Sequence, residues 1–474
     1  MIPKLDVKGP NVVKGIQLEG LRVIGKPAEL AKKYYDQGAD EILYIDIVAS
    51  LYERNNLMRI VEETTSSGVY VPLTVGGGMR SVDDVKQLLR AGADKVAINT
   101  AATRRPEMIT EAAEVFGSQC IVGSIEAKHQ GEGKWEAYVD NGRERTGLDA
   151  LEWAKKLAEL GAGELLLTSV DRDGTKKGFD TDLISKIVNS VSIPVVACGG
   201  AGTTEDVSAC FEKTKCDAVA FGTILHYNTA EIGQVKTELE AKGIPIRKFV
   251  ERPSIPENKT NMKTVSIVDY GAGNLRSVIN AFKSIGAPVK VVGTPEEVRS
   301  AELLVLPGDG AFGYAINQIK KMGLDDALKE YAASGKPLFG ICLGMQLLLS
   351  ESEEFGMHKG LSLIPGRVLP FRAPEPSEDK SYTVPHIGWN SLMRPANKEW
   401  AGTMLQDAED GALAYFVHSF YVRPNNPEDS LANTTYGGQE FCTVLQKDNI
   451  YATQFHPEKS GEYGINMLRY FCNL

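Results

Sequence analysis

The sequence has few cysteines and no pattern that pairs them. Its 474 residues include seven Cys, an odd number, and none of them form a Cys-x-x-Cys pair. Such a scattered set argues against both a disulfide framework and a zinc site. We therefore expect no metal and no cofactor, and we take the cytoplasm as the compartment.

Long apolar runs and an excess of basic residues are also missing. No stretch approaches the roughly 18 apolar residues that a membrane-spanning helix needs. The net charge of −10 argues against a nucleic-acid backbone as a partner. The first residues, Met1 to Asp6, resemble a structural strand rather than a signal peptide. The sequence thus favours a protein that acts on small molecules, without a membrane or nucleic-acid partner.

The length predicts two domains, because 474 residues are too many for one hydrophobic core. A hydrophobic content of 43% and a charged content of 24% are ordinary for globular domains. The stretch 251–262 contains two prolines and many polar residues, which is typical of a linker. We therefore predict domains at 1–250 and 263–474, joined by this linker.

The first domain alternates short β-branched runs with longer amphipathic stretches. Eight such alternations over about 250 residues are typical of a (β/α)8 TIM barrel, with a doubly wound open sheet as the alternative. The second domain alternates strands and helices as an open α/β sheet does. The predicted barrel strands are 5–7, 42–46, 71–75, 95–98, 121–125, 164–168, 194–197 and 218–221.

An internal repeat supports closure of the barrel. The segment from Gly76 to Thr100 has a counterpart from Gly199 to Thr223, at the same spacing. Two fused half-barrels explain this correspondence. Glycine and threonine at the carboxyl ends of strands expose backbone N–H groups that can bind phosphate. Because the motif occurs twice, the sequence predicts a substrate with two phosphate groups.

Two carboxylates are predicted to face each other in the mouth of the barrel. Asp6 ends the first strand, and Glu126 ends the fifth. Such a pair can divide acid and base roles if the environment separates the two pKa values. Lys14, in the loop predicted after the first strand, could reach an anionic substrate.

A second candidate centre surrounds Cys342. The residue lies between a predicted strand and a predicted helix, and glycines flank it as in a nucleophile elbow. A helix N-terminus favours the thiolate form of cysteine. Far downstream, His456 and Glu458 supply a base and a carboxylate that can orient it. The alternative is that Cys342 is a buried structural thiol.

These motifs carry two resemblances. The segments 340–346 and 456–460 resemble the class I glutamine amidotransferases, and the whole second domain is similar to the glutaminase subunit of imidazole glycerol phosphate synthase. The first domain resembles the cyclase subunit of the same enzyme, on segments such as 5–8, 74–78 and 199–202. The resemblance implies that glutamine yields ammonia at Cys342. The ammonia would pass through the barrel to a bisphosphate ribulosyl formimino ribotide, in histidine biosynthesis.

The resemblance also implies residue roles. The catalytic pair falls on Asp6 and Glu126. The phosphate contacts fall on Gly78, Asn99, Thr100, Asp173, Gly174, Gly200, Gly222 and Thr223. The oxyanion site falls on Gly308, Asp309, Gly310 and Leu343. The gate for ammonia falls on Lys4, Glu41, Lys95 and Glu164, and the contact between domains on Asp94, Lys459 and Trp389. Docking within one chain would replace a two-subunit complex.

Three positions depart from the family pattern. Glu126 is one methylene longer than the usual Asp. Lys4 should point inward below Asp6, and we expect it to replace a missing Arg by pairing with Glu41 or Glu164, or else to block the ammonia route. Asp309 replaces an apolar residue. Two alternatives therefore stay open: an amidotransferase with another acceptor, such as an activated sugar in surface-polysaccharide amidination, and a scaffold without catalysis.

Overall fold

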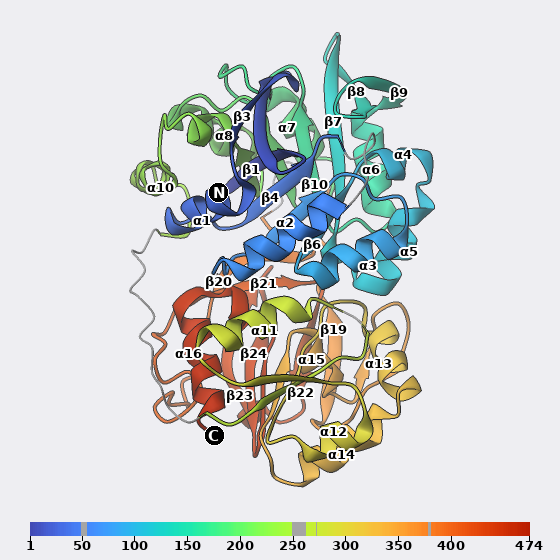
Figure 1. Cartoon of the computed structure of the whole chain (residues 1–474), viewed down its shortest axis with the longest axis vertical. Helices are drawn as coiled ribbons and strands as arrows, with labels where there is room; N and C mark the ends of the chain where they lie inside the picture. Colours follow the sequence, from blue (N-terminus) through green and yellow to red (C-terminus); the bar gives the residue numbers. More distant parts are fainter. Residues whose placement is uncertain (49–54, 249–261, 272, 378–380) are drawn as a thin grey trace. The chain divides into compact units, whose positions relative to one another are not determined.

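The computed structural model describes residues 1–48, 55–248, 262–271, 273–377 and 381–474 (Figure 1). All of the predicted linker except Met262 lies outside these ranges. The chain forms two compact units. One consists of Met1–Ala113, Ser118–Arg252 and Ala373–Val384, and the other of Glu114–Gly117, Pro253–Arg372 and Pro385–Leu474.

The first unit is the predicted TIM barrel. Within the described residues, eight parallel strands close on themselves, because the last strand pairs with the first and the fifth pairs with the sixth. Each of the eight predicted strands is present. They are β1 (Ile2–Lys8), β4 (Ile42–Asp46), β5 (Leu73–Gly76), β6 (Lys95–Ile98), β7 (Ile121–Gly131), β10 (Glu164–Ser169), β11 (Val195–Cys198) and β12 (Ala218–Phe221).

Two antiparallel additions to the barrel were not predicted. Strands β2 (Asn11–Ile16) and β3 (Glu19–Gly25) extend β1, while β8 (Lys134–Val139) and β9 (Glu144–Asp149) extend β7. Figure 1 shows β7 and β8 as a long hairpin that projects past the other barrel strands. The turn between β2 and β3 passes through Gln17 and Leu18, which have positive φ angles. Neither residue is a usual turn former, so the hairpin lacks a sequence signal.

Helices surround the strands, and a small apolar core fills the barrel interior with residues such as Leu43, Val122, Leu166 and Val196. Helices α3 and α8 both begin with a capping box, Ser81 with Asp84 and Thr203 with Asp206, so the half-barrel repeat extends to the helix caps. The helices are α1 (Pro27–Asp36), α2 (Asn55–Ser66), α3 (Val82–Ala91), α4 (Thr100–Arg104), α5 (Glu107–Phe116), α6 (Ala150–Glu159), α7 (Thr181–Val188), α8 (Thr204–Thr214), α9 (Thr223–His226) and α10 (Ile232–Ala241).

The second unit is an α/β unit whose main sheet is half parallel. The parallel half runs in the order β14 (Val289–Val292), β13 (Val265–Val268), β15 (Leu303–Leu306), β16 (Leu338–Ile341) and β25 (Ile450–Thr453). The predicted open sheet is therefore present, but the sheet continues into further strands, most of them antiparallel to their neighbours, that we did not predict. These are β24 (Gln439–Lys447), β23 (Ser430–Tyr436), β22 (Phe420–Pro424), β19 (Gly366–Pro370), β17 (Glu351–Ser352) and β18 (His358–Lys359).

Strands β20 (His386–Ser391) and β21 (Leu413–His418) form a separate antiparallel pair. Large apolar side chains from the sheet and its helices, among them Phe312, Leu328 and Leu347, make up the core of this unit. Burial of such side chains is the main source of its stability. The helices are α11 (Leu275–Ser284), α12 (Pro295–Ser300), α13 (Phe312–Lys321), α14 (Leu324–Ala333), α15 (Leu343–Leu347) and α16 (Gly461–Cys472).

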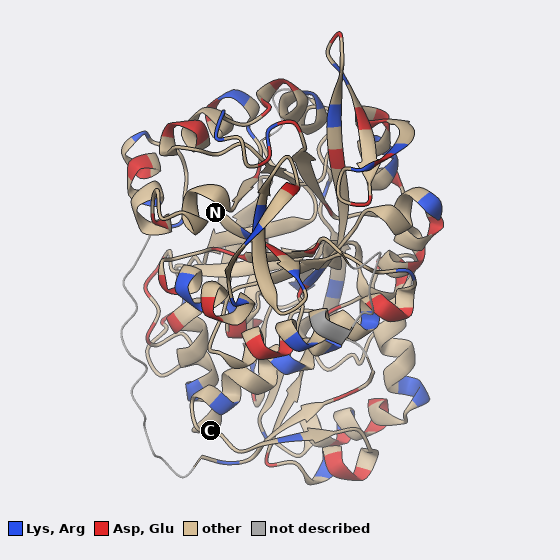
Figure 2. Cartoon of the chain, turned by 45° about the horizontal axis from the view of Figure 1, so that its top comes forward, with Lys and Arg blue, Asp and Glu red and all other residues tan. Residues whose placement is uncertain are grey.

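Positions of Lys and Arg and positions of Asp and Glu are interspersed along the helices of each unit (Figure 2). Among the described residues, no helix has the length and apolar character needed to cross a membrane.

Candidate active sites

Cys342 occupies a sharp turn between β16 and α15. Its φ angle is +52°, which is unusual for a residue other than glycine, and such strain often marks a functional position. The Cys342 N–H donates to the carbonyl of Thr453 at 2.7 Å, which holds the turn in place. A Cβ atom at Gly344 would lie 1.9 Å from the Leu306 carbonyl oxygen, so only glycine fits there. The structure therefore has the elbow geometry that the sequence predicts.

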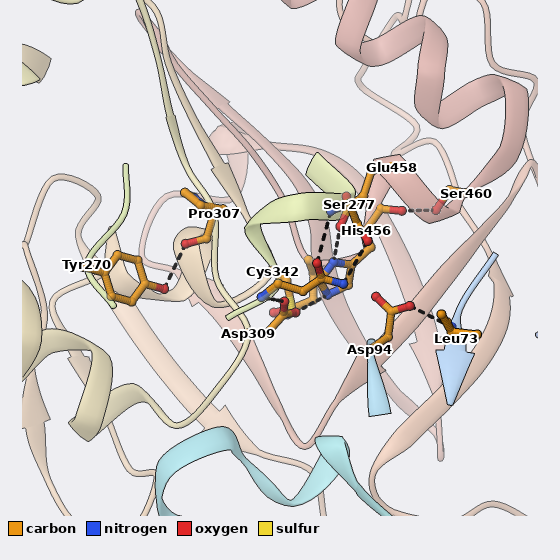
Figure 3. Close-up of polar contacts among 12 residues, drawn as sticks. Leu73, Asp94, Tyr270, Ser277, Pro307, Asp309, Cys342, His456, Glu458 and Ser460 are labelled. Carbon is orange, nitrogen blue, oxygen red and sulfur yellow. Dashed lines mark hydrogen bonds and ion pairs between the residues drawn. The ribbon is translucent and has the colours of Figure 1, made fainter. Parts of the chain in front are cut away.

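His456 and Glu458 lie beside this thiol, and Figure 3 shows their side chains converging on Cys342. His456 follows β25, and its Nδ1 lies 2.7 Å from Glu458 Oε1. Burial alone would lower the pKa of His456, but Glu458, Cys342 and Asp309 together raise it well above the ordinary value. The arrangement thus favours an imidazolium next to the thiol, as in cysteine nucleophiles that a histidine activates.

Asp309 makes a side-chain contact that we did not predict. We assigned it to the oxyanion site through its backbone, but its side chain reaches His456, with Oδ1 3.3 Å from Nε2. The second oxygen, Oδ2, accepts the N–H of Asn274 at 2.9 Å. Leu343, another predicted oxyanion donor, gives its N–H to the carbonyl of Gly308 at 3.3 Å. In this structure the Leu343 N–H is therefore already engaged.

Two glutamines near the thiol were not predicted as site residues. Gln454 Nε2 lies 3.7 Å from the sulfur of Cys342, within the range of a weak hydrogen bond to sulfur. Gln346 donates to the Oε1 of Gln454 at 3.3 Å and to the carbonyl of Phe420 at 2.9 Å. Both side chains are buried. Gln346 lies in the segment 340–346, and Gln454 lies two residues before His456. This closeness to the catalytic motifs could have indicated both residues, since buried amides need hydrogen-bond partners.

Glu354 is a buried carboxyl group in the same unit. Its Oε2 accepts the N–H of Phe312, the first residue of α13, at 2.6 Å. Burial raises the pKa of Glu354 to about 7 from an ordinary value of 4.5, against the opposing effect of this hydrogen bond. The folded state therefore holds this proton in a pH range where the unfolded chain has released it.

We expect Glu354 to make stability depend on pH. Because its pKa is raised on folding, its contribution is complete below pH 4.5 and is lost as the pH rises through about 7. Between pH 5 and 8, the free energy of unfolding of the wild type should fall by up to about 3 kcal/mol relative to Glu354→Gln. Urea titrations at several pH values measure this difference. The neighbouring variant Glu353→Gln, at an exposed ion pair with Arg367, should show no such trend.

The predicted pair at the barrel mouth lies in contrasting surroundings. Asp6 is buried between two ammonium groups, with Lys4 Nζ at 3.0 Å and Lys14 Nζ at 3.4 Å. Burial alone would raise the pKa of Asp6, but Lys4 and Lys14 outweigh it and lower the pKa. Glu126 accepts the N–H of Gly142 at 2.7 Å. Burial, opposed by this bond, raises the pKa of Glu126 to about 7. One carboxyl is thus held ionised, and the other still carries its proton in about half of the molecules at pH 7.

The predictions for Lys4 and Lys14 need correction. Lys4 pairs with Asp6 rather than with Glu41 or Glu164, because residues two apart on a strand share one face. Lys14 lies in strand β2 rather than in a loop, and its Nζ is 2.7 Å from Oδ1 of Asp173. The Asp173 carboxylate therefore binds an ammonium group, and only its backbone could meet a phosphate.

A cavity of about 370 Å³ opens at the mouth of the barrel unit. Four predicted residues line it: Gly78, Asn99, Thr100 and Glu126. Three arginines that we did not predict also line it, namely Arg80, Arg104 and Arg105. Guanidinium groups suit phosphate and carboxylate ligands. The residues predicted for the second phosphate, Gly174, Gly200, Gly222 and Thr223, do not line this cavity.

Tight packing accounts for glycine at two of those second-phosphate positions. A Cβ atom at Gly200 would lie 2.1 Å from the carbonyl oxygen of Gly178, and one at Gly222 would lie 2.8 Å from that of Lys4. Gly200 also has a φ angle of +114°. The backbone at these positions thus requires glycine whether or not a ligand binds.

The other three predicted gate residues form one buried cluster. Lys95 Nζ lies 2.9 Å from Glu41 and is also paired with Glu164, and Thr74 donates to Glu41. Lys95 is completely buried. Burial, reinforced by the charge of Glu41 and opposed by Lys95, raises the pKa of Glu164 to about 7. The cluster depends on its single ammonium group, since two carboxylates would otherwise repel each other.

Replacement of Lys95 should therefore destabilise the barrel strongly. Lys95→Met leaves Glu41 and Glu164 without the cation that both contact, which should lower the free energy of unfolding by about 3 kcal/mol. A shift of the urea midpoint measures the loss. The surface variant Lys155→Met removes an exposed pair with Glu152 and should cost no more than about 0.5 kcal/mol. An equal effect of the two variants would contradict a central role for Lys95.

Two of the three predicted domain-contact residues, Asp94 and Trp389, contact a residue of their own unit. Asp94 Oδ2 accepts the N–H of Leu73 at 2.7 Å. Trp389 packs edge-on against Tyr415, with ring centroids 5.9 Å apart. Lys459 ends the short 3-10 helix η3 (Pro457–Lys459), which contains Glu458. Lys459 therefore lies in the same short helix as Glu458, directly after His456 in the chain.

The chain matches two family models. Residues 1–231 match the one described as histidine biosynthesis protein, and residues 266–473 match glutamine amidotransferase class-I. The chain is 59% identical over 206 residues to imidazole glycerol phosphate synthase subunit HisF of Legionella pneumophila, covering 44% of this chain and 97% of that protein. It is 51% identical over 247 residues to the subunit of the same name from Bacillus cereus (strain Q1), covering 52% and 98%.

Proposed function

We propose that this one polypeptide carries out the whole imidazole glycerol phosphate synthase reaction of histidine biosynthesis. The chain belongs to that family, because it joins a HisF-type barrel to a class I glutamine amidotransferase domain. Glutamine and the phosphoribulosyl formimino-aminoimidazole carboxamide ribotide are the substrates. The products are glutamate, imidazole glycerol phosphate and the aminoimidazole carboxamide ribotide. The observation that carries the proposal is the presence of both a Cys–His–Glu centre and a barrel-mouth carboxyl pair in one chain.

Glutamine hydrolysis would begin with attack of the Cys342 thiolate on the carboxamide carbon. The strained turn carries the sulfur, which is buried, and Gln454 offers it an N–H. His456 gives a proton to the departing ammonia, which leaves a thioester on Cys342. The imidazole then takes a proton from water, the resulting hydroxide attacks the thioester, and glutamate is released. Glu458 holds the histidine ring through Nδ1 in both steps.

The ammonia would react with the ribotide at the barrel mouth. The low pKa of Asp6 suits a base, because the carboxylate is ionised. The pKa of Glu126, about 7, suits an acid that still carries its proton near neutral pH. Gly78, Asn99 and Thr100 would bind one phosphate, with help from the three arginines of the same cavity. Gly174, Gly200, Gly222 and Thr223 would bind the other, through their backbone.

We also propose that the two units dock within the chain, in place of a two-subunit complex. Asp94, Lys459 and Trp389 are the proposed contact residues, and the Lys95 cluster with Glu41 and Glu164 is the proposed gate through which ammonia enters the barrel. We leave Lys4 out of this proposed gate, because its ammonium group pairs with Asp6. Substrates of this kind favour a cytoplasmic location.

The test is glutamate release by the purified chain, with and without the ribotide, while loss of the ribotide is followed. Strong stimulation with matched consumption of both substrates would support the proposed function. Consumption of the ribotide with ammonium salt but not with glutamine would place the fault in glutamine hydrolysis or ammonia transfer. No consumption with either nitrogen source would contradict the proposal and favour another acceptor, such as an activated sugar.

A further inference from the structure

Two groups, Cys342 and Asp309, compete for one nitrogen of His456. The Nε2 atom must serve Cys342 if the histidine is to act on the thiol and on the departing ammonia. In the structure, Oδ1 of Asp309 lies 3.3 Å from that same nitrogen. The aspartate is anchored at its other oxygen by the N–H of Asn274, at 2.9 Å. Figure 3 shows Asp309 on the same side of the imidazole as Cys342.

The loop that carries Asp309 is closely packed. A Cβ atom at Gly273 would lie 2.9 Å from the backbone nitrogen of Asp309. Asn274 itself caps helix α11, because its side chain accepts the N–H of Ser277. The Asp309 side chain keeps 19% of its surface exposed, so it is neither forced into the core nor free in solvent. The close packing of the loop and the N–H of Asn274 thus hold the Asp309 carboxylate next to His456.

Four titratable groups lie around His456. Glu458 lies on Nδ1, Cys342 and Asp309 lie toward Nε2, and His418 contributes from β21. Burial lowers the pKa of His418 to about 3, so that ring is neutral. Tyr270 lies near Asp309 and Cys342, and burial raises its pKa, so it is neutral as well. Asp309 is therefore the one negative group, among those named here, that competes with the thiolate for the Nε2 proton.

We propose that Asp309 is a positioning residue that restrains glutamine hydrolysis by competing with Cys342 for the Nε2 side of His456. The proposal rests on the proposed glutaminase function of this centre. An imidazolium bound to a carboxylate is a weaker acid toward ammonia. This imidazolium also loses its proton only at a higher pH. The neutral imidazole, which is the base for the thioester step, therefore forms only at that higher pH. The carboxylate in addition disfavours the neighbouring thiolate, because the two charges have the same sign.

The matched test is Asp309→Asn, which removes the charge and keeps an oxygen for the N–H of Asn274. Without the ribotide, kcat for glutamine hydrolysis at pH 7 should rise about fivefold, the size expected for loss of a partly exposed ion pair. The acidic limb of the pH profile should shift to lower pH. Asp309→Val lacks both charge and hydrogen bond and should shift the limb in the same direction. Asp410→Asn is the control, because Asp410 lies outside the centre and accepts the exposed N–H of Arg394.

A second readout does not depend on glutamine. The rate of Cys342 alkylation by iodoacetamide, followed by mass spectrometry across the pH range, should reach its midpoint at lower pH in both Asp309 variants. Cys342→Ser supplies the blank. Unchanged or slower hydrolysis with unchanged midpoints would overturn the proposal. If no protein releases glutamate, the proposed glutaminase function fails, and the alkylation midpoints still decide whether Asp309 acts on the thiol.

Discussion

Replacement of Cys342 by serine should abolish glutamine-dependent turnover and leave ammonium-dependent turnover in place. The hydroxyl is a far weaker nucleophile than a thiolate paired with an imidazolium, so glutamine hydrolysis should fall at least about a thousandfold. Serine has nearly the same volume, and it meets the same positive φ angle of +52° as the cysteine does. The fold of the turn should therefore survive the change.

The measurement compares the two nitrogen sources in one protein. With ammonium salt, ribotide consumption by Cys342→Ser should stay within about twofold of the wild type, because distant sites contribute independently. The control is Cys442→Ser in the same unit. Burial raises the pKa of Cys442 to about 12, so that thiol is not ionised. Loss of glutamine hydrolysis in Cys442→Ser, or its retention in Cys342→Ser, would contradict the assignment.

Replacement of Glu126 by glutamine should have the converse effect. The variant cannot donate the proton that we assign to Glu126, and loss of a general acid typically costs about a hundredfold to ten-thousandfold. Ribotide consumption with ammonium salt should fall by that factor, while the rate of glutamine hydrolysis without the ribotide should stay unchanged. Glu152→Gln, on the exposed start of α6, is the control and should keep full activity.

The pH dependence of the barrel reaction gives the same residue a second test. An acid must carry its proton, so the rate with ammonia should fall as the pH rises through about 7, the pKa of Glu126. Because ammonium deprotonates over a higher range, the rate must be compared at equal concentrations of free ammonia. Glu126→Asp keeps a carboxyl group and should retain measurable turnover. The falling limb of its pH–rate profile should lie at a different pH from that of the wild type. A flat profile in the wild type would contradict the acid role.

Much of the fold follows from local patterns in the sequence. The eight barrel strands are short apolar runs at regular spacing, and the repeated glycine and threonine motifs indicate closure. The elbow at Cys342 is also local, because strand, turn and helix are consecutive in the chain. The hairpin β2–β3 was missed because Gln17 and Leu18 give no turn signal.

Both a local contact and contacts between distant segments were missed at the sites. Lys4 and Asp6 are two residues apart, so their pairing could have been read from strand alternation alone. The contact of Asp309 with His456 joins segments far apart in the chain, and no pattern within either segment indicates it. The arginines of the cavity, Arg104 and Arg105, follow a predicted phosphate motif, but only the folded chain shows that they line the same space.

The most direct test of the account is the fate of the glutamine nitrogen. The purified chain is given the ribotide and glutamine labelled with ¹⁵N in its amide, in the presence of an equal concentration of unlabelled ammonium salt. If the thiol centre feeds the barrel within one chain, the imidazole glycerol phosphate carries mostly ¹⁵N, and one glutamate appears for each ribotide consumed. Glutamate release without any imidazole glycerol phosphate would contradict the central claim that this chain joins the two reactions.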